Sequence, residues 1–224
     1  MINLTKTLKP VNITAVELLK IFACREAYPN DTLIWTQNGE NRIISMLDGD
    51  MVIYSRTPCD SELESFVRML SPRSVFSDLE TIKSLFGIGY TEACVMRKSG
   101  TTSGEFIQGD TLKSDEIYGI FSSAGLEMPP FEYFATDFCH RINRLHAFCF
   151  ALREKCAAIS FHTDGACLIN GIASLKKGYG SLALNQLLIR EDGKTAFACC
   201  TEDLCEFYRK NGFEFIYKTA YWKR

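Results

Sequence analysis

A glycine turn between a strand-like run and a helix-like run is the part of the sequence best suited to chemistry. Residues 166–174 read as a strand, residues 179–189 have the apolar spacing of a helix, and Gly178 and Gly180 lie at the junction. A strand that leads directly into a helix presents unpaired backbone amides and the positive end of the helix dipole, which together bind phosphate. Glycine at these two positions lets a pyrophosphate approach the amides.

Other interpretations of this turn can be compared with the phosphate site. A turn that only connects two elements stays an alternative, because two glycines alone are weakly specific. A Walker loop is excluded, since no Gly-Lys-Ser or Gly-Lys-Thr ends the turn. A Rossmann fingerprint is disfavoured: Ala183 can fill the third glycine position, but no parallel strand with an acidic end follows about twenty residues later.

Histidines and cysteines offer a second kind of site, for a metal ion. The best set in the sequence is His146, Cys149, Cys156 and His162, but strand-like residues surround it and its spacing matches no zinc module. The chain has 10 cysteines and no Cys-x-x-Cys pair. We therefore expect no metal, and we expect the cysteines to be reduced and mostly buried as small apolar side chains.

Length and composition indicate a folded chain with a substantial core. The 224 residues fit one large domain or two small ones, and 46% hydrophobic against 23% charged residues argues against disorder. With 25 Lys and Arg against 27 Asp and Glu, the chain lacks the basic excess of a nucleic-acid binder. No apolar run approaches the roughly 18 residues of a spanning helix, and no export signal begins the chain. We expect a cytoplasmic protein without nucleic-acid or membrane partners.

Hydrophobic periodicity predicts the elements that position the turn. Before residue 88 it predicts a helix over 14–27, a strand over 32–37, a hairpin around Asp48-Gly49, and two short helices whose capping boxes begin at Ser61 and Ser77. After Gly87 and Gly89 a new pattern begins. It predicts a strand over 92–98, helices over 114–123 and 131–144, a three-stranded meander over 146–174, a strand over 195–200, a helix over 202–210 and a strand over 213–222.

This order of elements, together with two short motifs, resembles the GCN5-related N-acetyltransferase (GNAT) family. The family's pyrophosphate turn, Arg/Gln-x-x-Gly-x-Gly/Ala, is matched at both glycines, with Leu175 in place of Arg or Gln. The family's Phe-Tyr-x-x-x-Gly-Phe helix motif is matched from Phe207 to Phe213. The resemblance covers roughly residues 91–224 and extends to uncharacterised bacterial members with an extra amino-terminal lobe.

The resemblance implies an α/β (α+β) fold with a mixed, mostly antiparallel sheet flanked by helices. It implies an acetyltransferase domain over residues 89–224 and a smaller, degenerate α/β lobe over residues 1–88, which could shape the acceptor site. Only 11 residues follow Phe213, fewer than the family's usual two strands need. Closure of the sheet is therefore expected to draw on the amino-terminal part.

The resemblance also implies a site for acetyl-CoA between the strands 166–174 and 195–200, which splay apart in the family. Gly171 could mark the bulge that opens them. The family's contacts are made by the backbone and carry over as follows: the pantetheine pairs near Ile172, Ala173 and Ser174, and the pyrophosphate meets the amides of Gly178, Tyr179, Gly180, Ser181 and Leu182. Lys176 or Lys177 would supply the charge that Leu175 lacks.

Tyr208 is the residue that the motif match assigns to catalysis. A phenol near the thioester sulfur can protonate the leaving thiolate, because its unperturbed pKa of about 10 keeps it protonated at pH 7. The alternative is a half-buried tyrosine that packs a helix on the sheet. Cys199 and Cys200 lie on the neighbouring strand with side chains on opposite faces, and one of them could line the cofactor tunnel.

Asp137, His140 and Arg141 share one face of the helix 131–144, since they are spaced by one helical turn. In the family fold this helix flanks the acceptor groove, which makes the three side chains candidates for binding or deprotonating an amine. A structural salt bridge, at the surface or between the lobes, is the alternative. No other general base is evident.

Together these observations favour an enzyme that moves an acetyl group from acetyl-CoA to an amine by direct transfer in a ternary complex. The acceptor would be a small-molecule or peptide amine, and the enzyme a monomer or homodimer. One alternative is a non-catalytic CoA-binding or regulatory GNAT-like module, which Leu175 and the absence of an evident general base favour. Another is an interaction domain that binds no cofactor.

Overall fold

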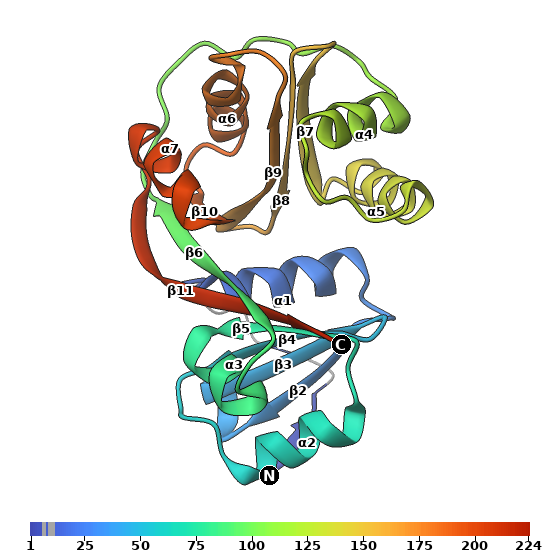
Figure 1. Ribbon diagram of the computed structural model, residues 1–224, viewed down its shortest axis with the longest axis vertical. Coiled ribbons are helices and arrows are strands. Elements are labelled where there is room, and N and C mark those ends of the chain that lie inside the picture. The colour runs from blue at the N-terminus through green and yellow to red at the C-terminus, as the bar shows by residue number, and fades with distance from the viewer. Residues whose placement is uncertain (6–7, 9–11) are drawn as a thin grey trace. The chain divides into compact units, whose positions relative to one another are not determined.

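The computed structural model describes residues 1–5, 8 and 12–224. These residues form two compact units that do not follow chain order (Figure 1). Unit 1 contains Met1–Met96, Cys199–Arg209 and Glu214–Arg224, and unit 2 contains Arg97–Ala198 and Lys210–Phe213. The predicted boundary at residues 88/89 divides the chain into two lobes, 1–88 and 89–224. The two compact units are defined differently, by contacts, so this boundary stays a prediction.

The strands of unit 1 lie in the order β1-β2-β3-β4-β5-β11-β6. Neighbours from β1 to β4, and β5 with β11, are antiparallel, whereas β4 and β5 are parallel. The last strand of the sequence therefore pairs with a strand of the amino-terminal part, as the short stretch after Phe213 led us to expect. The bounds are β1 Ile2–Leu4, β2 Leu33–Gln37, β3 Arg42–Leu47, β4 Asp50–Ser55, β5 Ser74–Asp78, β6 Tyr90–Lys98 and β11 Glu214–Lys223.

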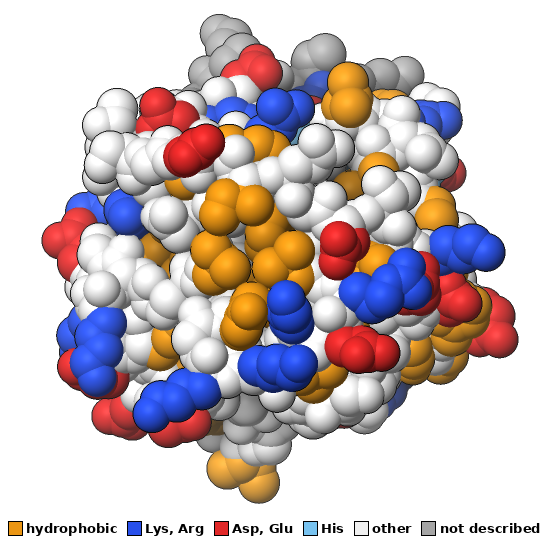
Figure 2. Space-filling view, turned by 90° about the horizontal axis from the view of Figure 1, so that it is seen from above, with side chains coloured by type: hydrophobic (Ala, Val, Ile, Leu, Met, Phe, Trp, Pro, Cys, Tyr) orange, Lys and Arg blue, Asp and Glu red, His pale blue; other side chains and the backbone are white. Residues whose placement is uncertain are grey.

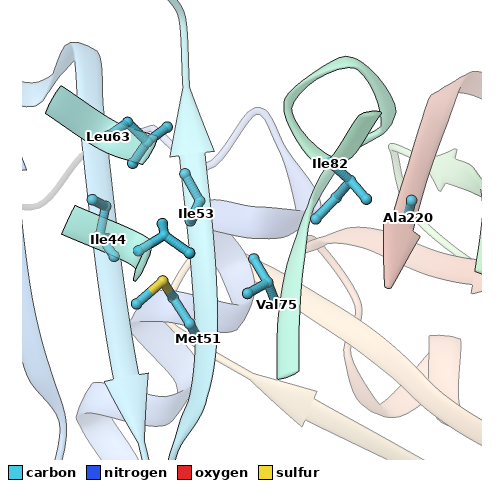
Figure 3. Packing of buried hydrophobic residues seen from close by; sticks show 8 residues of the cluster. Ile44, Met51, Ile53, Leu63, Val75, Ile82 and Ala220 are labelled. Atoms are coloured by element: carbon cyan, nitrogen blue, oxygen red, sulfur yellow. The ribbon is translucent and has the colours of Figure 1, made fainter. Parts of the chain in front are cut away.

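Helices cover both faces of the unit 1 sheet. Side chains alternate between the two faces of a strand, so Ile43 packs with α1 (Val16–Ala27), while Ile44 packs with α2 (Ser61–Leu70) and α3 (Leu79–Phe86). Figure 3 shows the second of these cores, in which Leu63 and Ile82 approach the sheet. Each fully buried side chain of this kind stabilises the fold by about 1.5–3 kcal/mol. Unit 1 also contains the 3-10 turns Gly39–Asn41 and Glu202–Leu204 and all but the last residue of the short helix α7 (Cys205–Lys210).

Turns and caps of unit 1 test the local predictions. The hairpin at Asp48-Gly49 is confirmed, with φ of 51° and 83°, both in the left-handed region that a two-residue turn of this type requires. The predicted caps are wrong by one residue: Asp60, not Ser61, accepts from the Leu63 amide, and Asp78, not Ser77, accepts from the Thr81 amide. At both helix starts the neighbouring aspartate outcompetes the serine hydroxyl, because its carboxylate is charged and the helix start is positive.

Unit 2 is a meander followed by a parallel strand. β7 (Ala147–Leu152), β8 (Cys156–His162) and β9 (Ala166–Ser174) pair antiparallel, and β10 (Thr195–Cys200) pairs parallel to β9. The parallel pairing needs a crossover, which α6 (Tyr179–Arg190) supplies. Within unit 2 the strands β7–β9 separate α6 from α4 (Ser114–Ser123) and α5 (Phe131–Asn143) (Figure 1).

Sequence periodicity located most of these elements but missed β1 and β5. β5 has five residues and ends directly before α3. The sequence analysis assigned Ser77 to the cap of that helix and therefore predicted no strand there. The predicted fold class, a mixed and mostly antiparallel sheet arrangement flanked by helices, is confirmed.

Apolar and charged side chains are both found on the surface. Seen from above, apolar side chains gather at the centre of the view, and Lys, Arg, Asp and Glu side chains are interspersed around them (Figure 2). In the part of the chain that the structure describes, no helix is both long enough and apolar enough to cross a membrane.

Candidate active site

The end of the parallel pair β9–β10 is the first feature of the candidate site. Paired residues run from Ala166 with Thr195 to Ile169 with Ala198. Directly after this point β9 has a bulge against β8: Ile159 pairs with Gly171 and Ser160 with Ile169, so Asn170 is the extra residue. The bulge expected near Gly171 is therefore present, one residue earlier.

Gly171 itself is required by close packing. A Cβ atom at this position would lie 2.9 Å from Cε1 of Phe121, a buried side chain of α4. Beyond it, Ile172, Ala173 and Ser174 still pair with β8 and lie past the last residue of β9 that is paired with β10. A strand edge of this kind offers backbone donors and acceptors to an extended ligand.

The glycine turn begins where β9 ends. The Leu175 amide donates to the Lys155 carbonyl at 2.8 Å, and the Ser174 hydroxyl donates to the Lys176 carbonyl at 2.6 Å, which fixes the start of the turn. Gly178 precedes α6 with φ of 88°, a conformation that a residue with a side chain rarely adopts. A Cβ atom there would meet nothing within 4 Å, so the space in front of the helix start is open.

The first turn of α6 has backbone amides available for a ligand. The Tyr179 amide donates to Lys176 and the Leu182 amide to Gly178. For Gly180 and Ser181, by contrast, no acceptor of the amide occurs among the residues that the structure describes. No side chain caps this helix and its first turn has no acidic residue. These amides and the helix dipole therefore form a place suited to an anion.

Positive charge near the turn comes from lysines on both sides. Lys176 and Lys177 are exposed, and Lys155, directly before β8, places its Nζ 5.3 Å from the centroid of the Tyr179 ring. Leu175 is 39% exposed and lines a hollow of about 290 Å³ along α4, together with Arg153. The position where the family has Arg or Gln thus carries no charge of its own.

The two motifs that carry the resemblance meet within unit 2. The Asn211 side-chain amide donates to the Ser181 hydroxyl at 3.3 Å, and Lys98 Nζ donates to the Asn211 carbonyl at 3.2 Å. Gly212 follows with φ of 85°, and a Cβ atom there would lie 3.4 Å from Lys98 Nζ. The glycine of the second motif therefore lets the chain pass Lys98 and reach the start of α6.

Tyr208 belongs to unit 1 and is buried, with 7% of its surface exposed. Its ring contacts that of Phe207 edge to face at 5.2 Å. Burial raises the pKa of the phenol well above its ordinary value, and Cys200 and Cys199 act in the same direction. The hydroxyl thus keeps its proton at neutral pH, as a general acid must; its catalytic role stays a prediction.

The helix face predicted for the acceptor contains an ion pair within α5. Arg141 Nε donates to Asp137 at 2.8 Å, and the Arg141 guanidinium lies over the Phe161 ring at 4.3 Å. Arg141 is 4% exposed, while His140 is half-buried. Arg141 is therefore held by its own helix and by β8, which leaves Asp137 and His140 as the more accessible members of the set.

The histidines and cysteines considered for a metal have other surroundings. His162 Nδ1 lies 2.7 Å from Glu191 and its Nε2 lies 2.8 Å from the Leu145 carbonyl. All ten cysteines are free thiols, and burial raises the pKa of Cys149 to about 12. Among residues 1–5, 8 and 12–224, no three His, Cys, Asp or Glu side chains are arranged to hold a metal ion.

Two buried carboxyl groups were missed from the sequence. Glu191 follows α6 and accepts from Ser160, His162 and Lys194; burial opposes its ionisation, but the bonds from His162 and Lys194 outweigh burial and lower its pKa to about 2. Glu17 lies in α1, and its carboxyl accepts from the hydroxyl groups of Tyr217 and Thr219. The sequence signal for Glu17 was its position as a charged residue inside the mostly apolar run 16–23. In the structure every side chain of that run except Lys20 is buried.

The fold that these elements define is that of the GCN5-related N-acetyltransferases. A solved N-acetyltransferase of this family from Sphaerobacter thermophilus is 13% identical, with 99% of this chain and 94% of that chain covered at a TM-score of 0.53. A conserved protein of unknown function from Staphylococcus epidermidis is 8% identical, with 83% of this chain and 91% of that chain covered at a TM-score of 0.54. No protein-family model matches the sequence, and no curated protein matches it significantly. The likeness establishes the GNAT-like fold.

Proposed function

We propose that this protein is an acyl-CoA-dependent N-acetyltransferase that moves an acetyl group from acetyl-CoA to an amine by direct transfer in a ternary complex. The observation that carries the proposal is the start of α6, where Gly178 leaves open space in front of the amides of Gly180 and Ser181. Both motifs of the family converge there through Ser181 and Asn211. Acetyl-CoA would supply the activated acetyl thioester.

In this proposal the cofactor is held mainly by the backbone. Ile172, Ala173 and Ser174 pair with its pantetheine along the free edge of β9, and the amides from Gly178 to Leu182 receive its pyrophosphate. Lys177 contributes charge, and Lys155 is placed to add to it beside Tyr179. Tyr208 protonates the leaving thiolate, and the accessible face of α5 at Asp137 and His140 meets the acceptor.

The cofactor part is tested by thermal unfolding with CoA. A ligand that binds only the folded state stabilises it by about 2.7 kcal/mol at a hundredfold excess over Kd, so CoA is expected to raise Tm. Gly180→Val is expected to remove this shift, because its side chain would stand between the pyrophosphate and the amides. The matched control is Gly165→Val, at a glycine with open space and an ordinary φ. A full CoA shift in Gly180→Val would place the phosphate site elsewhere.

The acceptor part is tested with His140→Ala. We expect kcat/KM for the amine to fall about tenfold while the CoA-induced shift in Tm is unchanged, because removing uniform binding to one substrate raises only its KM. The measurement is free-thiol release against amine concentration. If the variant only loses thermal stability, or loses both affinities equally, the α5 face has a structural role.

A further inference from the structure

Unit 1 contains a hollow of about 440 Å³ between α2, α3 and the end of β11. This volume lies within the roughly 300–1,000 Å³ of small-molecule sites. Aromatic rings, guanidinium groups and a carboxylate line it together: Phe86 and Trp222, Arg68 and Arg224, and Glu64. All of them belong to unit 1, so the hollow is complete within that unit.

The walls of the hollow are fixed by the fold of unit 1. Val67 belongs to the apolar core of which Figure 3 shows the members, and Leu85 packs against that core. The Arg224 amide donates to the Arg73 carbonyl at 3.0 Å, which ties the residue after β11 to the residue before β5. A ligand that enters a preformed hollow does not have to order its walls, and its affinity is higher for that reason.

Two stacked aromatic rings form the apolar part of the hollow. The centroids of the Phe86 and Trp222 rings are 4.1 Å apart and their planes differ by 5°. Both side chains are only half-buried, so each keeps surface that the protein does not cover. A flat aromatic face of this kind binds another planar ring by offset stacking.

Glu64 and Arg68 provide opposite charges one helical turn apart on α2. This spacing allows an ion pair. Among residues 1–5, 8 and 12–224, however, no ion pair joins the two side chains, and none includes Arg224. All three side chains are exposed. Neighbouring charges of both signs are therefore available to a ligand.

The ends of two helices add to the negative side of this arrangement. α2 ends at Leu70 and α3 at Phe86, and the last turn of each contributes residues to the hollow. The last carbonyls of a helix carry partial negative charge and accept hydrogen bonds from cations. Together with Glu64 they make a place for an ammonium group beside the place that Arg68 and Arg224 make for a carboxylate.

We propose that the hollow of unit 1 binds a free aromatic α-amino acid. Such a molecule has an ammonium group and a carboxylate on one carbon and a flat ring one carbon further, which match the three parts of the hollow. The guanidinium groups of Arg68 and Arg224 bind its carboxylate as forks, Glu64 binds its ammonium group, and its ring stacks on Phe86 and Trp222. A residue inside a peptide has neither charge, so the free amino acid is the ligand. This site goes beyond the proposed transferase activity.

The first test compares four ligands on the parent protein by titration calorimetry. L-Phenylalanine is expected to bind saturably, with one equivalent per chain. Its N-acetyl derivative lacks the ammonium charge, its amide lacks the carboxylate, and L-alanine lacks the ring. Each of these three is expected to bind about tenfold more weakly or worse, because it loses hydrogen bonds to a charged group or the stacking contact.

The second test assigns each charge of the ligand to its partner. In Glu64→Gln the preference for L-phenylalanine over its N-acetyl derivative is expected to disappear, while the preference over the amide remains. In the double variant Arg68→Ala/Arg224→Ala the reverse is expected. The matched controls are Glu80→Gln and Arg73→Ala, which remove exposed charges of unit 1 outside the hollow and are expected to bind as the parent does.

The ring contact is tested with Trp222→Leu. The preference for L-phenylalanine over L-alanine is expected to fall about tenfold in this variant. Tyr221→Leu is the control, because Tyr221 is the next residue of β11, is 41% exposed and points to the opposite face of the strand. Urea denaturation shows which variants are folded, and the comparison of ligands on the parent does not depend on any of them.

Binding of all four ligands with equal affinity, or no binding of L-phenylalanine, would overturn the proposal. An unchanged preference in Glu64→Gln, in the double arginine variant or in Trp222→Leu would place the amino acid elsewhere in the protein and would overturn it as well. None of these results affects the CoA-induced shift in Tm, so this proposal and the proposed transferase function can fail separately.

Discussion

Tyr208→Phe is expected to lower kcat by about 100- to 10,000-fold on an acceptor for which the chemical step limits the rate. The phenylalanine ring can keep the packing of Tyr208 against Phe207, so the variant is expected to fold and to retain CoA binding. What it loses is a hydroxyl whose pKa is raised by burial, and which therefore keeps a proton to donate to the leaving thiolate. Single-turnover thiol release, with CoA binding measured by the shift in Tm, separates these two effects.

The matched control for Tyr208 is Tyr118→Phe in unit 2. Tyr118 also packs against phenylalanines, Phe131 and Phe134, and its hydroxyl donates to the Pro129 carbonyl. It is outside the motifs, and its loss is expected to leave kcat unchanged. Equal turnover in the parent and Tyr208→Phe would make Tyr208 a packing residue. The proposed leaving-group acid would then be another group.

Arg42→Ala is expected to lower the free energy of unfolding by about 1–3 kcal/mol, the cost of leaving the buried acceptors of its guanidinium without a donor. Arg42 is 1% exposed and lies at the start of β3. Its guanidinium donates to Asp60 at 2.8 Å, to the Pro58 carbonyl at 2.7 Å and to the Ser55 hydroxyl at 3.0 Å. The same side chain therefore holds the segment before α2 and the residue that caps that helix. The measurement is urea denaturation.

Arg73→Ala provides the comparison, because Arg73 also pairs with an aspartate in unit 1. Its side chain is 61% exposed, and it pairs with Asp50 at 2.8 Å. Exposed pairs contribute about 0–1 kcal/mol, so this variant is expected to unfold almost as the parent does. A small effect of Arg42→Ala, comparable with that of Arg73→Ala, would show that solvent replaces the buried contacts of Arg42.

The sequence predicted those features of the fold and site that depend on local chemistry. Asp48-Gly49 predicted the hairpin because both residues tolerate positive φ, and Gly178 with the apolar helix after it predicted the turn before α6. Periodicity predicted β7 to β10 and the helices α4 to α6 closely. These features were accessible because each is determined by residues close together in the chain.

Features that depend on distant residues were not accessible. Glu17 and Tyr217 are separated by 200 positions, and only the pairing of β11 with β5 in the sheet beneath α1 brings them together. The ion pair of Asp137 and Arg141 could be predicted from their spacing of four residues in a helix. The position of Phe161 under Arg141 could not, because Phe161 lies on a different element. The predicted capping residues were wrong for a local reason. Serine and aspartate are neighbours at both helix starts, and the sequence analysis chose the serine.

The pairing of β11 with β5 has a consequence for how the chain is synthesised. A ribosome releases residues 1–96 long before residues 214–223, so β5 lacks its antiparallel neighbour while the residues in between are synthesised. An unpaired strand edge is a template for pairing with another chain. Glu92 on β6 and Lys218 on β11 form an ion pair at 3.1 Å only after release of the last strand. Nascent chains are thus exposed to edge-to-edge association until residues 214–223 have been synthesised, and a peptide with the sequence of β11 is expected to occupy that edge in a chain truncated before residue 214.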